Sequence, residues 1–134
     1  MDILVPVILG LGLFAVLRYV PRMMSGAQYI DTTTFKEAMR QGGDVLVIDV
    51  RTEREFATGH VPGALNLPVG DIKNRLKELG EQLEGHKEIP VYLVCRTDNR
   101  ATSAARTLKK AGFSDIKVLS GGMGAWNRAG YPSA

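Results

Sequence analysis

The sequence predicts an α/β domain with a central parallel sheet flanked by helices, and three observations support this fold class. Three short runs rich in aliphatic residues, at residues 45–48, 91–94 and 116–119, are typical of strands buried on both faces of a parallel sheet. Segments with helical patterns separate these runs. A chain of 134 residues has room for one such domain with a single core.

Helices are expected between and after the strands, over residues 32–40, 53–57, 69–83 and 101–111 and around Trp126. Thr32 or Thr33 can cap the first of these helices. Gly112 is the expected end of the helix over residues 101–111. A further brief strand is expected over residues 64–67, where proline follows.

The N-terminal part of the chain differs from the rest. Residues 3–17 are fifteen residues without a charge, and Arg18, Tyr19 and Arg22 follow them. A helix over residues 3–20 is about 27 Å long, just short of the roughly 30 Å hydrocarbon layer. Because Arg18 and Tyr19 suit the interface, we predict a transmembrane anchor helix over residues 1–22, followed by a linker over residues 23–27.

Two alternatives to an anchor are a cleaved secretory signal and an apolar helix packed on the domain. A secretory signal has a basic region before its apolar run, which Met1 and Asp2 do not supply. A helix packed on the domain has a polar face, which this run lacks. Because Arg18 and Arg22 follow the run, the positive-inside rule predicts a single-pass membrane protein with its C-terminal domain in the cytoplasm. The lone cysteine is compatible with a reducing compartment.

Charge and composition exclude several function classes. The net charge is +3, and residues 29–134 hold 15 basic and 13 acidic side chains. This mixture forms no basic stripe along the chain, so no nucleic-acid partner is predicted. One cysteine excludes an internal disulfide, and with only two histidines we predict no metal site and no cofactor.

Cys95 is the candidate for chemistry, because it directly follows the strand over residues 91–94 and precedes a helix. Ligands of open parallel sheets bind beyond the carboxyl ends of strands. Loop amides and the positive end of the next helix favour thiolate over thiol, and Arg96 and Arg100 add positive charge. The alternative is a buried small hydrophobe, but the polar loop over residues 96–100 is a poor place for one.

Three segments resemble the rhodanese family, and they occur in the family's order. They are VYLVCRTDNRA around Cys95, VIDVR with EF and GHVPGALNLP before it, and LSGG through Trp126, Gly130 and Pro132 after it. In that family a cysteine opens the active-site loop and an arginine closes it. The resemblance implies a rhodanese-like domain over residues 28–134.

The implied function is that of a thiosulfate sulfurtransferase-like enzyme. Sulfane sulfur would pass from thiosulfate or another persulfide donor to cyanide or a thiol, through a Cys95 persulfide. The implied partners are small sulfur-containing anions or thiols, the membrane through residues 3–20, and a protein as sulfur donor or acceptor. The implied substrate-binding residues are Arg96, Thr97, Asp98, Asn99 and Arg100 of the loop, with Asp49 and Arg51 at the neighbouring strand end.

Structural roles are predicted for several other residues of these segments. Arg100 is expected to hold the shape of the loop as well as to supply charge. His60, in a GHVPGA turn, is expected to make a structural hydrogen bond. Trp126 is expected to be core packing.

The main departure from the family pattern is Asp98, where glycine is frequent. Its carboxylate brings negative charge toward a thiolate and an anionic donor, so we predict weak thiosulfate turnover. The alternative function is a catalytically weak module that serves as a membrane-tethered binding or persulfide-relay domain. A phosphatase or arsenate reductase is disfavoured, because the four residues between Cys95 and Arg100 are one fewer than in related cysteine-dependent phosphatases.

Overall fold

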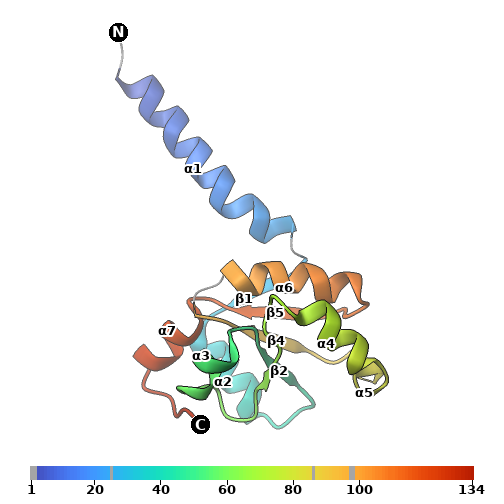
Figure 1. The fold of residues 1–134 in the computed structure, drawn as a ribbon. Helices are drawn as coiled ribbons and strands as arrows, with labels where there is room; N and C mark the ends of the chain where they lie inside the picture. Colours follow the sequence, from blue (N-terminus) through green and yellow to red (C-terminus); the bar gives the residue numbers. More distant parts are fainter. Residues whose placement is uncertain (1–2, 25, 86, 97–98) are drawn as a thin grey trace.

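The computed structural model describes residues 3–24, 26–85, 87–96 and 99–134 (Figure 1). The side chains of residues 18–24, 81, 82 and 99 are outside this description. The elements are α1 (Leu4–Met24), β1 (Gln28–Ile30), α2 (Thr32–Arg40), β2 (Leu46–Asp49), α3 (Glu53–Ala57), β3 (Leu65–Asn66), α4 (Ile72–Glu78), α5 (Gly80–Glu84), β4 (Val91–Val94), α6 (Asn99–Lys110), β5 (Ile116–Leu119) and α7 (Gly122–Arg128).

The five strands form one sheet in the order β1-β5-β4-β2-β3, and every neighbouring pair is parallel. The central strand is β4, and β2 lies beside it. Both strands are largely buried, as expected for a sheet covered on both faces. Their register pairs Asp49 with Val94. The Val50 amide then donates to the Val94 carbonyl at 2.9 Å, so the residues that follow the two strands leave the sheet side by side.

Helices cover both faces of the sheet (Figure 1). Residues of α4, α5 and α6 pack on one face, together with Leu93 and Cys95. Phe35 of α2 and Trp126 of α7 pack on the other face. Successive side chains of a strand point to opposite faces, so the alternation along β4 places the Cys95 side chain on the α6 face.

The predicted fold class is confirmed, and three elements differ in detail from the sequence analysis. The edge strand β1 was missed, because it has only three residues and pairs with β5 alone. The helix expected over residues 69–83 is two helices, α4 and α5, which meet at Leu79 with φ −94° and ψ 4°. The cap of α2 is Asp31, whose carboxylate accepts the Thr34 amide at 2.7 Å.

The prediction of a membrane anchor was wrong. Within residues 3–24, 26–85, 87–96 and 99–134, no helix combines the length and the apolar character that crossing a membrane requires. The uncharged run of fifteen residues gives a helix of only about 22 Å, whereas a span takes about 20 predominantly apolar residues. The predicted single-pass topology and the predicted cytoplasmic placement of the domain both depended on that anchor, so they were wrong for the same reason.

Candidate active site

Cys95 lies where the carboxyl ends of two adjacent strands diverge. From β2 the chain continues to β3 on one side, whereas from β4 it continues to β5 on the other. Such a switch point is where open parallel sheets bind ligands. The Cys95 side chain is only 1% exposed and belongs to the core cluster on the α6 face.

The start of α7 holds the backbone of the Cys95 loop in place. The Met123 amide donates to the Cys95 carbonyl at 2.7 Å, and the Gly124 amide donates to the Arg96 carbonyl at 3.5 Å. Gly121 precedes this turn with φ +77°, and a Cβ there would lie 2.9 Å from the Ala125 Cβ. Glycine is therefore required at residue 121, because the left-handed backbone and the close approach both exclude a side chain.

Arg100 ties the start of α6 to α3 through a two-point ion pair. Its Nη1 donates to Glu55 Oε1 at 2.6 Å, and its Nη2 donates to Glu55 Oε2 at 2.8 Å. Glu55 is itself positioned by a capping box, in which the Thr52 hydroxyl accepts the Glu55 amide at 3.2 Å and Glu55 Oε1 accepts the Thr52 amide at 3.2 Å. The guanidinium is thus held at the last position of the loop by a carboxylate with a fixed orientation.

This ion pair shifts the pKa values of both partners. The Arg100 hydrogen bonds are the main cause that lowers the pKa of Glu55 from 4.5 to about 2. Burial raises this pKa by a smaller amount, and the Thr52 hydrogen bonds lower it further. The pKa of Arg100 is raised, first by its hydrogen bonds to Glu55 and then by the nearby charges of Glu55, Cys95 and Asp49. Arg100 therefore stays cationic and interacts electrostatically with Cys95.

The N-terminus of α6 is a second positive feature beside Cys95. This helix has twelve residues and begins at Asn99, four residues after Cys95. The first turn of a helix presents free amides and a partial positive charge. Together with the Arg100 cation, this environment favours a thiolate or another anion over a neutral thiol.

Asp49 and Arg51 form a buried pair at the adjoining end of β2. Asp49 is fully buried and accepts hydrogen bonds from the Arg51 amide, Nε and Nη2 at 2.7 to 3.0 Å. Arg51 Nη2 also donates to the Gly59 carbonyl at 2.7 Å. Asn66 fastens the same strand end by donating to the carbonyls of both residues at 3.0 and 2.9 Å. The pair builds the wall of the site, and direct contact of Asp49 or Arg51 with substrate stays a prediction.

The remaining loop residues are placed only in part. Arg96 is exposed. Thr97 and Asp98 lie outside the described residues, as does the side chain of Asn99. Their predicted roles in binding substrate therefore stay predictions.

Two predicted structural residues have the expected contacts. The His60 ring stacks on Phe56 with 3.6 Å between ring centroids, and its Nδ1 lies 2.9 Å from the Phe56 carbonyl oxygen. Because a carbonyl only accepts, Nδ1 carries the proton in this bond. Trp126 is fully buried and donates from Nε1 to the Pro132 carbonyl at 3.0 Å.

Sequence reasoning gave Glu55 no role in this site, although Glu55 belongs to the EF segment of the rhodanese resemblance. It lies 45 residues from Arg100, and no local pattern links the two. The signal available in the sequence was the Thr52-x-x-Glu55 spacing of a capping box. That spacing predicts the start of a helix, and it does not predict a second partner for the carboxylate.

Comparison with known proteins gives a consistent result. A family model described as the rhodanese-like domain matches residues 31–129. A sulfurtransferase of Allochromatium vinosum is 34% identical over 103 residues, which are 77% of this chain and 91% of that protein. An adenylyltransferase and sulfurtransferase of Arabidopsis thaliana is 30% identical over an alignment of length 107, which covers 72% of this chain and 23% of that protein.

The solved structures agree in fold. The rhodanese-like domain of an Anabaena protein has a TM-score of 0.68 and 27% identity, and the match covers 79% of this chain and 77% of that one. The chain spans only 49% and 39% of the length of two other relatives, from Bacillus subtilis and Mycobacterium tuberculosis. Because the family model covers residues 31–129, and with them the site around Cys95, this chain belongs to the rhodanese-like domain family.

Proposed function

We propose that the protein is a sulfurtransferase that carries a sulfane sulfur on Cys95. The observation that carries this proposal is the position of Cys95, at the carboxyl end of β4 and before the N-terminus of α6, with the Arg100 cation close enough to interact with its charge. The sulfurtransferase names of the Allochromatium and Arabidopsis relatives support the same class of reaction.

The proposed reaction has two displacement steps. The Cys95 thiolate attacks the outer sulfur of thiosulfate, the sulfur–sulfur bond of thiosulfate breaks, and sulfite leaves with the bonding electron pair. Cyanide or a thiolate then attacks the outer sulfur of the Cys95 persulfide, and the Cys95 thiolate leaves. Each step exchanges one bond to sulfur for another, so no external oxidant or reductant is required.

The other residues of the site divide between binding and support. The amides of the loop from Arg96 to Arg100, with the exposed Arg96 side chain, bind the anionic donor and the outer sulfur. Arg100 stabilises negative charge on Cys95 while Glu55 fixes its orientation. Asp49 and Arg51 hold the adjacent strand end, so that the wall of the site keeps its shape.

The test is thiocyanate production from thiosulfate and cyanide by the full chain, together with a mass spectrum of the intact protein after treatment with thiosulfate. We expect turnover and a gain of one sulfur atom, both absent in Cys95→Ser. A conservative control is Ser103→Ala, which alters an exposed residue of α6 and is expected to leave both readouts unchanged.

Three results would redirect the proposal. A folded protein with neither turnover nor the gain of sulfur would indicate a non-catalytic rhodanese module that acts by binding. Sulfur loading without turnover of cyanide would indicate a relay that delivers sulfur to a protein thiol. Hydrolysis of an aryl phosphate that depends on Cys95 would indicate a phosphatase.

A further inference from the structure

A positively charged groove of about 530 Å³ lies between α4 and α6. Four exposed cations line it: Lys73 and Lys77 of α4, and Arg106 and Lys110 of α6. Leu76 and Ala111 are its apolar lining residues, and none of the described residues that line it carries a carboxylate. The groove therefore concentrates positive charge in a domain whose overall charge is nearly balanced.

Neighbouring cations on α4 and on α6 repel each other. Lys73 and Lys77 are four residues apart, so they lie on one face and repel each other. Lys73 also lies in the first turn of α4, where the partial positive charge of the helix end disfavours a cation. Arg106 and Lys110 repeat the same spacing on α6. Lys77 and Lys110 lie in the last turns of their helices, where the helix dipole favours a cation. The repulsion between neighbouring cations is relieved if an anionic partner binds in the groove.

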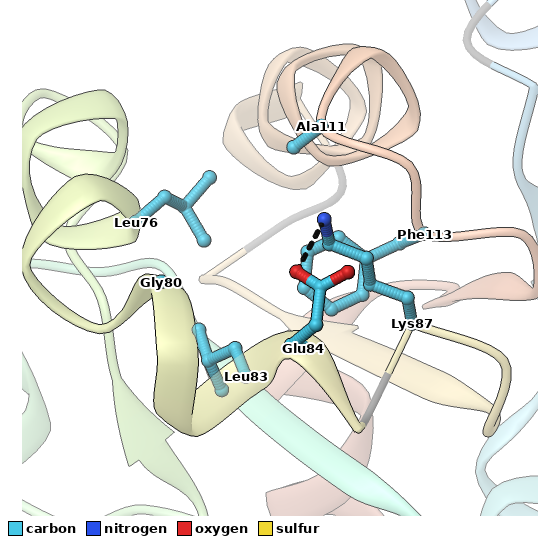
Figure 2. A pocket seen from close by; sticks show the side chains of 7 residues that line it. All are labelled: Leu76, Gly80, Leu83, Glu84, Lys87, Ala111 and Phe113. Carbon is cyan, nitrogen blue, oxygen red and sulfur yellow. Dashed lines mark ion pairs between the residues drawn. The ribbon is translucent and has the colours of Figure 1, made fainter.

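An apolar pocket adjoins the groove. It has a volume of about 130 Å³ and shares Leu76 and Ala111 with the groove. Figure 2 shows Leu76 and Leu83 projecting into this space from α4 and α5, and the Glu84–Lys87 ion pair, at 2.9 Å, beside Phe113. An apolar cavity of about 150 Å³ accommodates benzene, so this pocket has room for one aliphatic or small aromatic side chain.

Gly80 keeps the pocket open. It lines the pocket as the first residue of α5, and a Cβ built there would meet no atom within 4 Å. Its φ is outside the left-handed region. Neither backbone conformation nor crowding therefore requires glycine at residue 80, and the absence of a side chain leaves the space free for another group.

We propose that the groove and the pocket form one docking surface for an acidic segment of a partner protein. Carboxylates of that segment pair with Lys73, Lys77, Arg106 and Lys110, and one apolar side chain between them enters the pocket. A protein fits better than a nucleic acid, because a phosphate backbone has no aliphatic side chain for a pocket lined by Leu76 and Leu83. The surface is separate from the Cys95 site, because Arg106 is seven positions after Asn99 in α6, about 10 Å along the helix axis.

The test uses the full chain and a short fluorescein-labelled peptide in which Asp and Glu residues flank one central leucine. Binding is measured by fluorescence anisotropy at low and at moderate ionic strength. We expect saturable binding that weakens with salt. The affinity should fall about tenfold or more in the double variant Lys77→Glu with Lys110→Glu.

The matched control is the double variant Lys36→Glu with Arg40→Glu. It makes the same change in net charge, but on α2, which packs on the opposite face of the sheet. We expect it to bind the peptide nearly as the natural protein does. Circular dichroism establishes that each variant is folded before its affinity is compared.

The apolar pocket is tested separately from the charges. Gly80→Leu, whose Cβ would meet no atom within 4 Å, should weaken binding of the peptide. Serine in place of the central leucine of the peptide should weaken it too. Equal affinity for the leucine and serine peptides would overturn the proposed pocket. The proposal of an acidic protein partner would be overturned by any of three results. These are an equal loss of peptide affinity in the two charge-reversal variants, no binding of the peptide at all, or equal affinity for an oligonucleotide of the same charge. The assay involves no sulfur chemistry, so its failure leaves the sulfurtransferase proposal standing.

Discussion

Replacing Glu55 with glutamine tests the ion pair that holds Arg100 at the active site. The variant keeps the size of the side chain and an oxygen that accepts hydrogen bonds, and it removes the negative charge. In the natural protein both carboxylate oxygens of Glu55 accept from Arg100, at 2.6 and 2.8 Å. We therefore expect the variant to be less stable at neutral pH. We also expect its stability to lose the part of the acid dependence that comes from Glu55.

The size of the effect follows from the pKa shift and the exposure of the pair. A pKa lowered from 4.5 to about 2 corresponds to roughly 3 kcal/mol, at about 1.4 kcal/mol per pKa unit. The side chains of Arg100 and Glu55 are 33% and 31% exposed, so water screens their attraction, and exposed pairs contribute up to about 1 kcal/mol. We expect Glu55→Gln to lower the free energy of unfolding by about 1 to 2 kcal/mol at neutral pH.

The pH dependence has a definite sign. Because the pKa of Glu55 is lower in the folded protein than in the unfolded chain, its contribution is complete above the unfolded value of 4.5 and is lost as pH falls toward 2. More than half of it is lost by about pH 3. Asp31 and Glu37 also have lowered pKa values, but they are present in both proteins, so the difference between the two proteins isolates Glu55.

Urea unfolding at about pH 7 and about pH 3 measures this difference. The natural protein should lose about 1 kcal/mol more than Glu55→Gln between the two conditions. Glu78→Gln is the matched control, because it removes a carboxylate from an exposed ion pair with Arg75 at 3.5 Å, and it should keep the acid dependence. If the natural protein and Glu55→Gln lose the same stability on acidification, the Glu55–Arg100 ion pair does not stabilise the fold.

Three further predictions concern the wall, the turn and the loop of the site. Arg51→Met leaves the fully buried Asp49 carboxylate without its partner, and urea unfolding should show a loss of about 3 to 5 kcal/mol. Gly121→Ala places a Cβ 2.9 Å from another side-chain carbon of α7, so its melting temperature should fall further than that of Gly130→Ala, where φ is also positive but the space is open. Asp98→Gly should raise kcat/KM for thiosulfate by removing a negative charge from the loop, and unchanged steady-state kinetics would contradict this.

The buried strands were the most predictable part of the fold. The runs over residues 91–94 and 116–119 match β4 and β5, because a strand covered on both faces is rich in aliphatic residues. β1 gives no such signal, since only Ile30 of its three residues is buried. The break between α4 and α5 was also missed, although Gly80, directly after Leu79, is a poor helix former.

The site was predictable where its residues are close in sequence. Cys95 and Arg100 belong to one loop, so the polar composition of that loop and its place between a strand and a helix were sufficient to single them out. Glu55 is near Arg100 only because α3 and α6 both begin at the carboxyl edge of the sheet, after the adjacent strands β2 and β4. A contact of this kind depends on strand order, which the composition of either segment does not contain.

The same reasoning explains why counting charges along the chain missed the groove. Lys77 and Arg106 are 29 residues apart in sequence, and the acidic side chains around them make the overall charge nearly neutral. The chain returns from the sheet edge at β3 to β4 after α4 and α5, and this crossover places α4 and α6 on the same face of the sheet. Two i,i+4 pairs of cations, each unremarkable on its own helix, then line one groove. The strand order therefore creates this charged groove as much as the composition does. Charge reversal on α4 and α6 should weaken binding of the acidic peptide, whereas the same reversal on α2 should not.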